Sequence, residues 1–165
     1  MLKVKALLFD VFGTVVDWRT GIAREVESIA DKNHISLDPF DFADAWRAEY
    51  QPAMEEIRKG RRSFTILDIL HMENLKKIAP KFNLHNISDE DFKLLVTAWH
   101  RLPGWPDSSE GINLLKKKYI LATQSNGNIA LIVNMAKFSN LNWDVVLGAE
   151  VTGYHKPEPE AYLKA

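Results

Sequence analysis

The sequence predicts an α/β protein with a doubly wound parallel sheet and an inserted, all-helical segment. Short apolar runs at residues 4–9, 119–123 and 145–147 are separated by helical patterns. Such alternation is typical of βαβ units in a parallel sheet. After the first run, about eighty residues follow helical periodicity without interruption. A chain of 165 residues is long enough for one core and a small lid.

The first apolar run, Val4–Phe9, predicts a buried parallel strand because it is apolar without alternation and ends in turn chemistry. Asp10 follows it directly, at the end of the strand where open α/β sheets bind their ligands. Gly13 permits a sharp turn there, and the turn amides can face an anion. We therefore expect a functional carboxylate at Asp10.

The helical segment extends from Trp18 to residue 102, before the sequence Pro103-Gly104-Trp105-Pro106. Its first apolar stripe lies within residues 22–30. Three further helix starts follow, and each precedes apolar residues at helical spacing. These starts are Asp38-Pro39 before Phe42, Trp46 and Tyr50; Ser63 before residues 67–78; and Ser88, in a near capping box, before residues 92–99.

The βα alternation then resumes. Asp107 and Glu110 resemble a capping box for a helix that reaches Lys118. The strand-like run Tyr119–Thr123 ends at Gln124-Ser125-Asn126-Gly127, and a helix is predicted over residues 128–138. A short strand is predicted at residues 145–147, and another helix after Pro159.

Composition excludes several classes of function. The net charge of −1 gives no general attraction to nucleic acid or an anionic membrane. The basic run Arg58–Arg62 is either a solvated turn between helices or a polyanion site, and we favour the turn. The chain has no cysteine, and its first residues form a strand instead of a signal peptide. We expect a cytoplasmic protein with no nucleic-acid or membrane partner.

Three motifs occur in order: Asp10-x-Phe12-Gly13-Thr14, then Ser125-Asn126, then Lys156-Pro157. Together they resemble the haloacid dehalogenase superfamily, and the first motif resembles its 2-haloacid dehalogenase branch. The resemblance implies a Rossmann-like core formed by residues 1–17 and 103–165. It also implies a helical cap formed by residues 18–102.

The resemblance implies hydrolysis of short 2-haloalkanoic acids through an ester on Asp10, and it assigns a role to each matching residue. Lys156 would keep Asp10 ionised, and Thr14 would hydrogen-bond it. Three sets of residues would bind the substrate. The backbone amides of Val11 and Phe12, together with Ser125, would hold its carboxylate, and Arg47 and Asn126 would face the leaving halide. Tyr162, which follows Lys156 at the family's spacing, would also bind the substrate.

Phe12 separates this reaction from the superfamily's phosphatases, which carry a second Asp at that position to protonate the leaving group. A halide ion needs no proton, so an aromatic residue is compatible with dehalogenation. Magnesium prefers several carboxylates, and this motif offers only Asp10. We expect neither a metal nor another cofactor, and a phosphatase is the alternative within the superfamily.

Simpler interpretations remain open for single residues. Asp10 could be a helix N-cap, Ser125-Asn126 a turn, and Arg47 a surface ion-pair partner. The family's downstream strands have no counterpart before Ala165, so the chain resembles a fragment. A truncated, non-catalytic core is therefore the second hypothesis. It would bind small carboxylates weakly or self-associate, as a homodimer or otherwise, through the open edge of its first strand.

Overall fold

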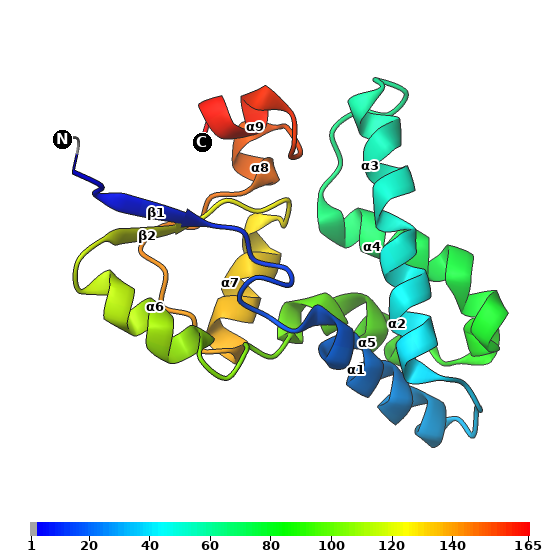
Figure 1. Ribbon diagram of the computed structural model, residues 1–165. Coiled ribbons are helices and arrows are strands. Elements are labelled where there is room, and N and C mark those ends of the chain that lie inside the picture. Colours follow the sequence, from blue (N-terminus) through cyan, green and yellow to red (C-terminus); the bar gives the residue numbers. More distant parts are fainter. Residues whose placement is uncertain (1–2) are drawn as a thin grey trace. The chain divides into compact units, whose positions relative to one another are not determined.

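The computed structural model describes residues 3–165, which form two compact units. One unit contains the chain up to Asp17 together with His100–Ala165, and the other contains Trp18–Trp99. Strands occur in the first unit, and the second is helical, so the α/β class is as predicted (Figure 1). Among the described residues, no helix is both long enough and apolar enough to cross a bilayer.

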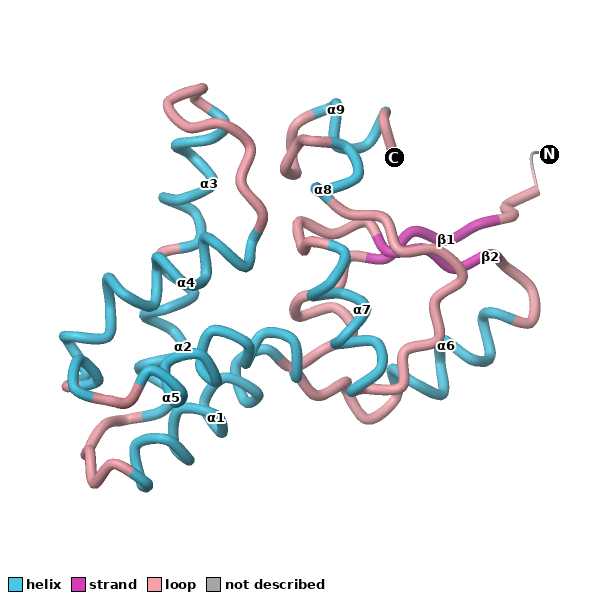
Figure 2. Tube along the Cα trace, turned by 180° about the vertical axis from the view of Figure 1, so that it is seen from behind, coloured by secondary structure: helices cyan, strands magenta, loops and turns pink. Residues whose placement is uncertain are grey.

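The α/β unit is built around two parallel strands, β1 (Ala6–Phe9) and β2 (Ile120–Thr123). Ala6 lies opposite Ile120, and Phe9 lies opposite Thr123. Helices lie on both sides of this pair, as expected for a doubly wound sheet (Figures 1 and 2). They are α6 (Ser108–Lys116) and α7 (Ile129–Phe138) on one side, with α8 (Ala149–Thr152) and α9 (Pro159–Leu163) on the other.

Strand β1 is shorter and more exposed than the sequence predicts. Val4 and Leu8 are 60% and 55% exposed, so the prediction of a buried strand is wrong for these positions. Within residues 3–165, β1 pairs with β2 alone, and its other edge is open. The apolar run of β1 therefore has a neighbouring strand on one side only, and some of its side chains remain exposed to solvent.

The third strand, predicted at residues 145–147, does not form as a separate element. Val145 and Gly148 make isolated parallel bridges to Ala122 and Ser125. Between them, the Thr123 hydroxyl donates to the carbonyl of Leu147 at 2.7 Å and accepts from its N–H at 3.0 Å. Backbone hydrogen bonds pair Val145 with Leu121 and Thr123, but at Leu147 the Thr123 side chain takes the place of the backbone ladder. The segment therefore forms no continuous strand.

The helical unit packs five α-helices around an apolar core. Phe42 is fully buried, and its ring contacts those of Trp46 and Phe82 edge-on, with centroids 5.6 and 5.2 Å apart. The helices are α1 (Trp18–Lys32), α2 (Pro39–Ala48), α3 (Tyr50–Arg58), α4 (Leu67–Ile78) and α5 (Asp89–Val96). Short 3₁₀ turns at Ala79–Phe82, Leu84–Asn86 and Thr97–Arg101 complete the helical segment.

The expected helix starts are confirmed in three of four cases, two of them with a capping side chain. The Asp38 carboxylate accepts from the N–H groups of Phe40 and Asp41, and the Ser88 hydroxyl accepts from Asp91. The start at Ser63 is wrong, because α4 begins at Leu67. Helix α6 begins directly after Asp107 as predicted, but the capping box there does not form, because the Asp107 side chain makes no capping hydrogen bond.

Two local causes account for further differences within the helical unit. The Thr65 hydroxyl donates to the Ser63 carbonyl at 3.0 Å, a local bond that competes with helix formation before α4. The predicted helix through Tyr50 divides into α2 and α3 at Glu49. Pro52 has no N–H to donate to the carbonyl of Ala48, so a helical hydrogen bond is missing at the break.

The basic run at residues 58–62 is an ion-paired turn. Arg58 and Lys59 both pair with Glu55 at 2.8 Å. The two arginines that follow pair with glutamates as well, Arg61 with Glu56 at 2.7 Å and Arg62 with Glu73 at 2.6 Å. These bonds favour the interpretation as a turn between helices.

Candidate active site

The candidate site forms where the two parallel strands end. Asp10 comes directly after β1, and Ser125 and Asn126 follow β2 by a few residues. The Gln124 N–H donates to the Phe9 carbonyl at 2.7 Å and joins the two chain segments beyond the strands. Because parallel strands end at one edge of the sheet, Asp10 and the Ser125-Asn126 pair share that edge.

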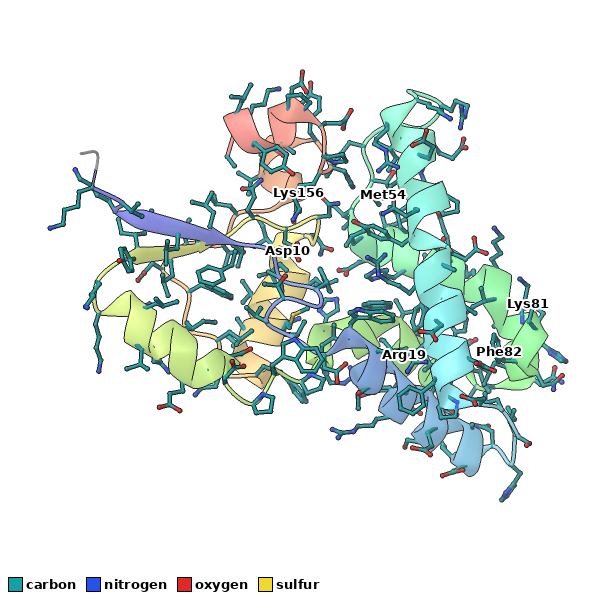
Figure 3. The ribbon with its side chains drawn as sticks, in the orientation of Figure 1. Asp10, Arg19, Met54, Lys81, Phe82 and Lys156 are labelled. Atoms are coloured by element: carbon teal, nitrogen blue, oxygen red, sulfur yellow. The ribbon has the colours of Figure 1, made fainter. Side chains whose placement is uncertain are left out.

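Both carboxylate oxygens of Asp10 are engaged. Its Oδ1 lies 2.6 Å from the Lys156 ammonium, and its Oδ2 accepts from the Thr14 hydroxyl at 2.9 Å. Figure 3 shows Asp10 at the end of β1 and Lys156 on the segment between α8 and α9. The Lys156 side chain is 19% exposed, whereas that of Asp10 is 46% exposed. The carboxylate is therefore oriented from both sides yet accessible to a small molecule.

The loop after Asp10 is a tight turn. The Val11 carbonyl accepts from the N–H groups of Thr14 and Val15 at 3.2 and 3.0 Å. Gly13 has a φ of 86°, in the region that favours glycine. The Trp105 indole N–H donates to the Gly13 carbonyl at 3.2 Å and connects this turn to the segment before α6. These bonds set where Thr14 lies relative to Asp10.

The second motif is buried beneath the site. Ser125 is 1% exposed, and its hydroxyl accepts from the Gly127 N–H at 3.1 Å. Asn126 is also buried, and its carbonyl oxygen accepts from the Lys156 N–H at 2.6 Å. A hydrogen bond therefore joins the second motif, at Asn126, directly to the backbone of Lys156 in the third motif.

Two glycines let the backbone approach closely around this motif. A Cβ atom on Gly148 would lie 2.4 Å from the Gly127 carbonyl oxygen. A Cβ atom on Gly127 would lie 2.7 Å from the side chain of Ile132. A larger residue at Gly148 would displace the backbone of the loop that carries Ser125 and Asn126, whereas one at Gly127 would first displace the Ile132 side chain.

The structure brings some predicted residues together and leaves others apart. Asp10, Thr14, Asn126 and Lys156 form one connected set of hydrogen bonds and one ion pair. Tyr162 lies on α9 and is 53% exposed. Val11 is buried in the turn beside Asp10, and Phe12 is half-buried there.

Arg47 lies on α2 of the helical unit. Its guanidinium lies 4.1 Å from the centroid of the Tyr50 ring and 5.8 Å from that of Trp18. Trp18 in turn stacks on Trp99. These aromatic contacts restrict the orientation of the Arg47 side chain.

Sequence reasoning missed three residues that shape the site: Trp105, Gln124 and Gly148. Gln124 directly precedes the second motif, and its side chain donates to the Ala161 carbonyl of α9 at 2.6 Å. Trp105 lies in the Pro-Gly-Trp-Pro sequence that marked a boundary, and nothing in that pattern indicated a contact with Gly13. Within residues 3–165, no cluster of three or more histidine or acidic side chains could hold a metal ion.

Solved structures similar to this chain include two L-2-haloacid dehalogenases. The defluorinating enzyme Rha0230 is 46% identical with a TM-score of 0.93, over 97% of this chain and 66% of its own. The enzyme PA0810 is 38% identical with a TM-score of 0.92, over 98% of this chain and 69% of its own. This chain thus spans about two thirds of the length of either relative.

A third structure, the L-2-haloacid dehalogenase from Xanthobacter autotrophicus with chloropropionic acid covalently bound, supports the fold alone. It is 18% identical with a TM-score of 0.81, over 98% of this chain and 63% of its own. A search among curated proteins found no match. The model of the haloacid dehalogenase-like hydrolase family matches residues 4–165. The chain therefore belongs to the haloacid dehalogenase-like hydrolases.

Proposed function

We propose that this chain carries the active site of a 2-haloacid dehalogenase that hydrolyses short 2-haloalkanoic acids through an ester on Asp10. The single observation that carries the proposal is the Asp10 carboxylate, held between Lys156 and Thr14 at a strand end and still accessible. The 46% and 38% identity to two L-2-haloacid dehalogenases supports the same substrate class.

The first step is displacement at carbon. An Asp10 oxygen attacks C2 of the haloacid, a carbon–oxygen bond forms, and the halide leaves with the electron pair of the carbon–halogen bond. Lys156 holds one carboxylate oxygen in place, and Thr14 fixes the rotation of the carboxylate through the other oxygen. In the second step, water attacks the Asp10 ester carbonyl. This step releases the 2-hydroxy acid and a proton, and it restores the carboxylate.

The other roles follow the family resemblance. Ser125 and the amides of Val11 and Phe12 bind the substrate carboxylate in this proposal, and Tyr162 completes the binding side. We assign Arg47 and Asn126 to the leaving halide, with the helical unit as the cap. The contacts of Arg47 with Tyr50 and Trp18 support a fixed guanidinium.

Phe12 favours this reaction over phosphate-ester hydrolysis. It stands two residues after Asp10 and has no group that could protonate an alkoxide. A halide ion leaves without a proton, so the same site is sufficient for a carbon–halogen bond. Because Rha0230 is described as defluorinating, we include 2-fluoro acids among the candidate substrates.

A second candidate function is self-association without catalysis. The observation that favours it is the edge of β1, which is open within the described residues; Leu8 in this strand and Val4 just before it are exposed. Open apolar edges pair readily with another chain. Sedimentation of the purified chain would distinguish a monomer from a dimer or larger species.

The test of the proposed reaction is halide release from 2-chloropropionate with protein in excess, together with the intact mass. We expect one halide for each substrate molecule and an alkyl adduct on Asp10 that forms before the ester is hydrolysed. Asp10→Asn should give neither, because an amide is a poor nucleophile. Asp144→Asn is the matched control, since Asp144 is also paired with a lysine in the α/β unit, at 2.8 Å from Lys116.

Halide release by Asp10→Asn at the wild-type rate would refute the nucleophile assignment. Magnesium-dependent cleavage of a phosphate ester, with no halide release from any haloacid, would place the chain among the phosphatases instead.

A further inference from the structure

Arg47 is a half-buried arginine of the helical unit whose contacts are with aromatic rings. Its guanidinium lies over the Tyr50 ring, 4.1 Å from the centroid, and 5.8 Å from the centroid of Trp18. Within the described part of the chain it forms no ion pair with a carboxylate. By contrast, Arg19 in the same unit pairs with Asp44 at 2.7 Å. The Arg47 side chain is therefore oriented by rings and not by a counter-ion.

Tyr50 is the nearer of the two rings, and the backbone explains its place. It follows Arg47 by three residues, and residues at that spacing are neighbours on a helix surface. Helix α2 ends at Ala48 and α3 begins at Tyr50, but Glu49 between them stays in the right-handed helical region, with φ −72° and ψ −12°. The break therefore keeps the Tyr50 ring beside the guanidinium. Met54, fully buried one turn later on α3, holds this face of the helix toward the core.

A ring contact leaves the N–H groups of Arg47 available for an anion. A cation within about 6 Å of a ring centroid is attracted to the face of the ring through its charge. The N–H groups of a guanidinium lie in its plane and point outward from its edge. A ring therefore restricts the side chain without occupying a donor, whereas a carboxylate partner occupies two, as Asp44 does with Arg19.

We infer that Tyr50 is a positioning residue, whose ring orders the Arg47 guanidinium and leaves its N–H groups for the leaving halide. This inference rests on the proposed function, in which Arg47 binds that halide. Trp18 is the more distant support, and it stacks on Trp99, which is 3% exposed. At the shorter distance, Tyr50 attracts the cation more strongly. Tyr50 acts on the reaction through Arg47, and it does so by the face of its ring instead of its hydroxyl.

The first experiment measures the order of the Arg47 side chain and needs no catalysis. The nitrogen–proton nuclear Overhauser effect of the Arg47 Nε–Hε group reports its motion, and loss of the signal in Arg47→Lys assigns it. We expect an ordered group in the wild type and in Tyr50→Phe, which keeps the ring. Tyr50→Leu removes the ring and should make the group mobile. If Tyr50→Leu does not fold, Tyr50→Gln serves the same comparison at this half-buried position.

Phe40→Leu is the matched control for the loss of a ring. Arg19 lies over the Phe40 ring, 4.7 Å from the centroid, but its donors also pair with Asp44. The Arg19 Nε–Hε group should therefore stay ordered in Phe40→Leu. An Arg47 group that is as ordered in Tyr50→Leu as in the wild type would overturn the inference.

The second experiment tests whether Tyr50 acts through Arg47. First-turnover halide release from 2-chloropropionate is measured for the single variants and for the double variant. Tyr50→Leu should slow release by about tenfold, a change in the range of one cation–π contact, and Tyr50→Phe should restore most of the rate. In an Arg47→Ala background, Tyr50→Leu should cause no further loss, because the effects of residues that act as a unit do not add. Phe40→Leu should release halide at the wild-type rate.

Two kinetic results would also overturn the inference. An additive loss in the double variant would mean that Tyr50 acts independently of Arg47, and a loss in Tyr50→Phe as large as in Tyr50→Leu would assign the effect to the hydroxyl. An Arg47 group that becomes mobile in Tyr50→Leu, in a chain whose wild type releases no halide, would support the positioning by the ring while rejecting the proposed function. Unchanged release in Tyr50→Leu from an active wild type would reject this inference alone. The two failures are therefore distinguishable.

Discussion

Replacement of Lys156 by methionine tests the electrostatic arrangement of the site most directly. Methionine keeps an unbranched apolar stem and removes the ammonium that lies 2.6 Å from Asp10 Oδ1. The Thr14 hydroxyl still donates to the other carboxylate oxygen. The variant thus removes one charge while the nucleophile itself remains present.

The expected loss of stability is small. The two side chains of this ion pair are 19% and 46% exposed, so solvent screens their attraction. Pairs of this kind contribute about 1 kcal/mol or less. For a chain of this size, that loss lowers the melting temperature by roughly 2–4 °C.

The expected loss of activity is much larger. Removal of one preorganised electrostatic group from an active site typically costs about 10²–10³-fold in rate, or roughly 2.7–4 kcal/mol. Displacement requires a carboxylate that is already aimed at the substrate carbon, and in the proposed mechanism Lys156 supplies this orientation and a positive charge beside it. The effect on the first turnover should therefore exceed the effect on folding by a wide margin.

Lys116→Met is the matched control for this comparison. Lys116 pairs with Asp144 at 2.8 Å in the same unit, with side chains 27% and 33% exposed. Both variants should melt at slightly lower temperature, but only Lys156→Met should lose first-turnover halide release. Wild-type release from Lys156→Met, or an equal loss in both variants, would refute the reasoning.

Two further predictions concern the turn and the helical unit. Trp105→Phe keeps a ring but loses the N–H donated to the Gly13 carbonyl, so we expect about tenfold slower halide release, with melting lowered by only a few degrees. If Trp105→Phe released halide at the wild-type rate, the hydrogen bond from Trp105 to Gly13 would have no role in the reaction. The Lys32 ammonium, which hydrogen-bonds Asp91, holds the pKa of that carboxyl below its usual value. A lowered folded pKa stabilises the protein above the ordinary aspartate value of about 3.9, and this contribution is lost as the pH falls through the folded value. Asp91→Asn should thus melt below the wild type at neutral pH, with a smaller difference below about pH 3. Asp89→Asn, on the exposed face of the same first turn, is the control, and a pH-independent difference for Asp91→Asn would contradict the argument.

The sequence by itself determined the class of the fold and the position of the nucleophile candidate. Apolar runs that end in Asp10 and before Ser125-Asn126 are local patterns, and local patterns are sufficient to identify strand ends. Helix starts at Asp38 and Ser88 were predictable for the same reason, because a capping side chain bonds to amides only two or three residues away.

Local patterns failed where a distant segment or a competing bond decided the outcome. The strand expected at residues 145–147 is interrupted by hydrogen bonds from the Thr123 side chain. The exposure of Leu8 depends on which strands lie beside β1, and an apolar run does not encode its neighbours.

Only the tertiary structure decided how the site is assembled. Asp10 and Lys156 lie 146 residues apart in sequence, and Trp105 lies 92 residues from Gly13. Family resemblance placed Lys156 near Asp10, but the anchoring of Lys156 by Asn126 emerged from the folded chain. Such contacts depend on how the strands, turns and helices pack in three dimensions. Their geometry is set by packing that no short stretch of sequence contains.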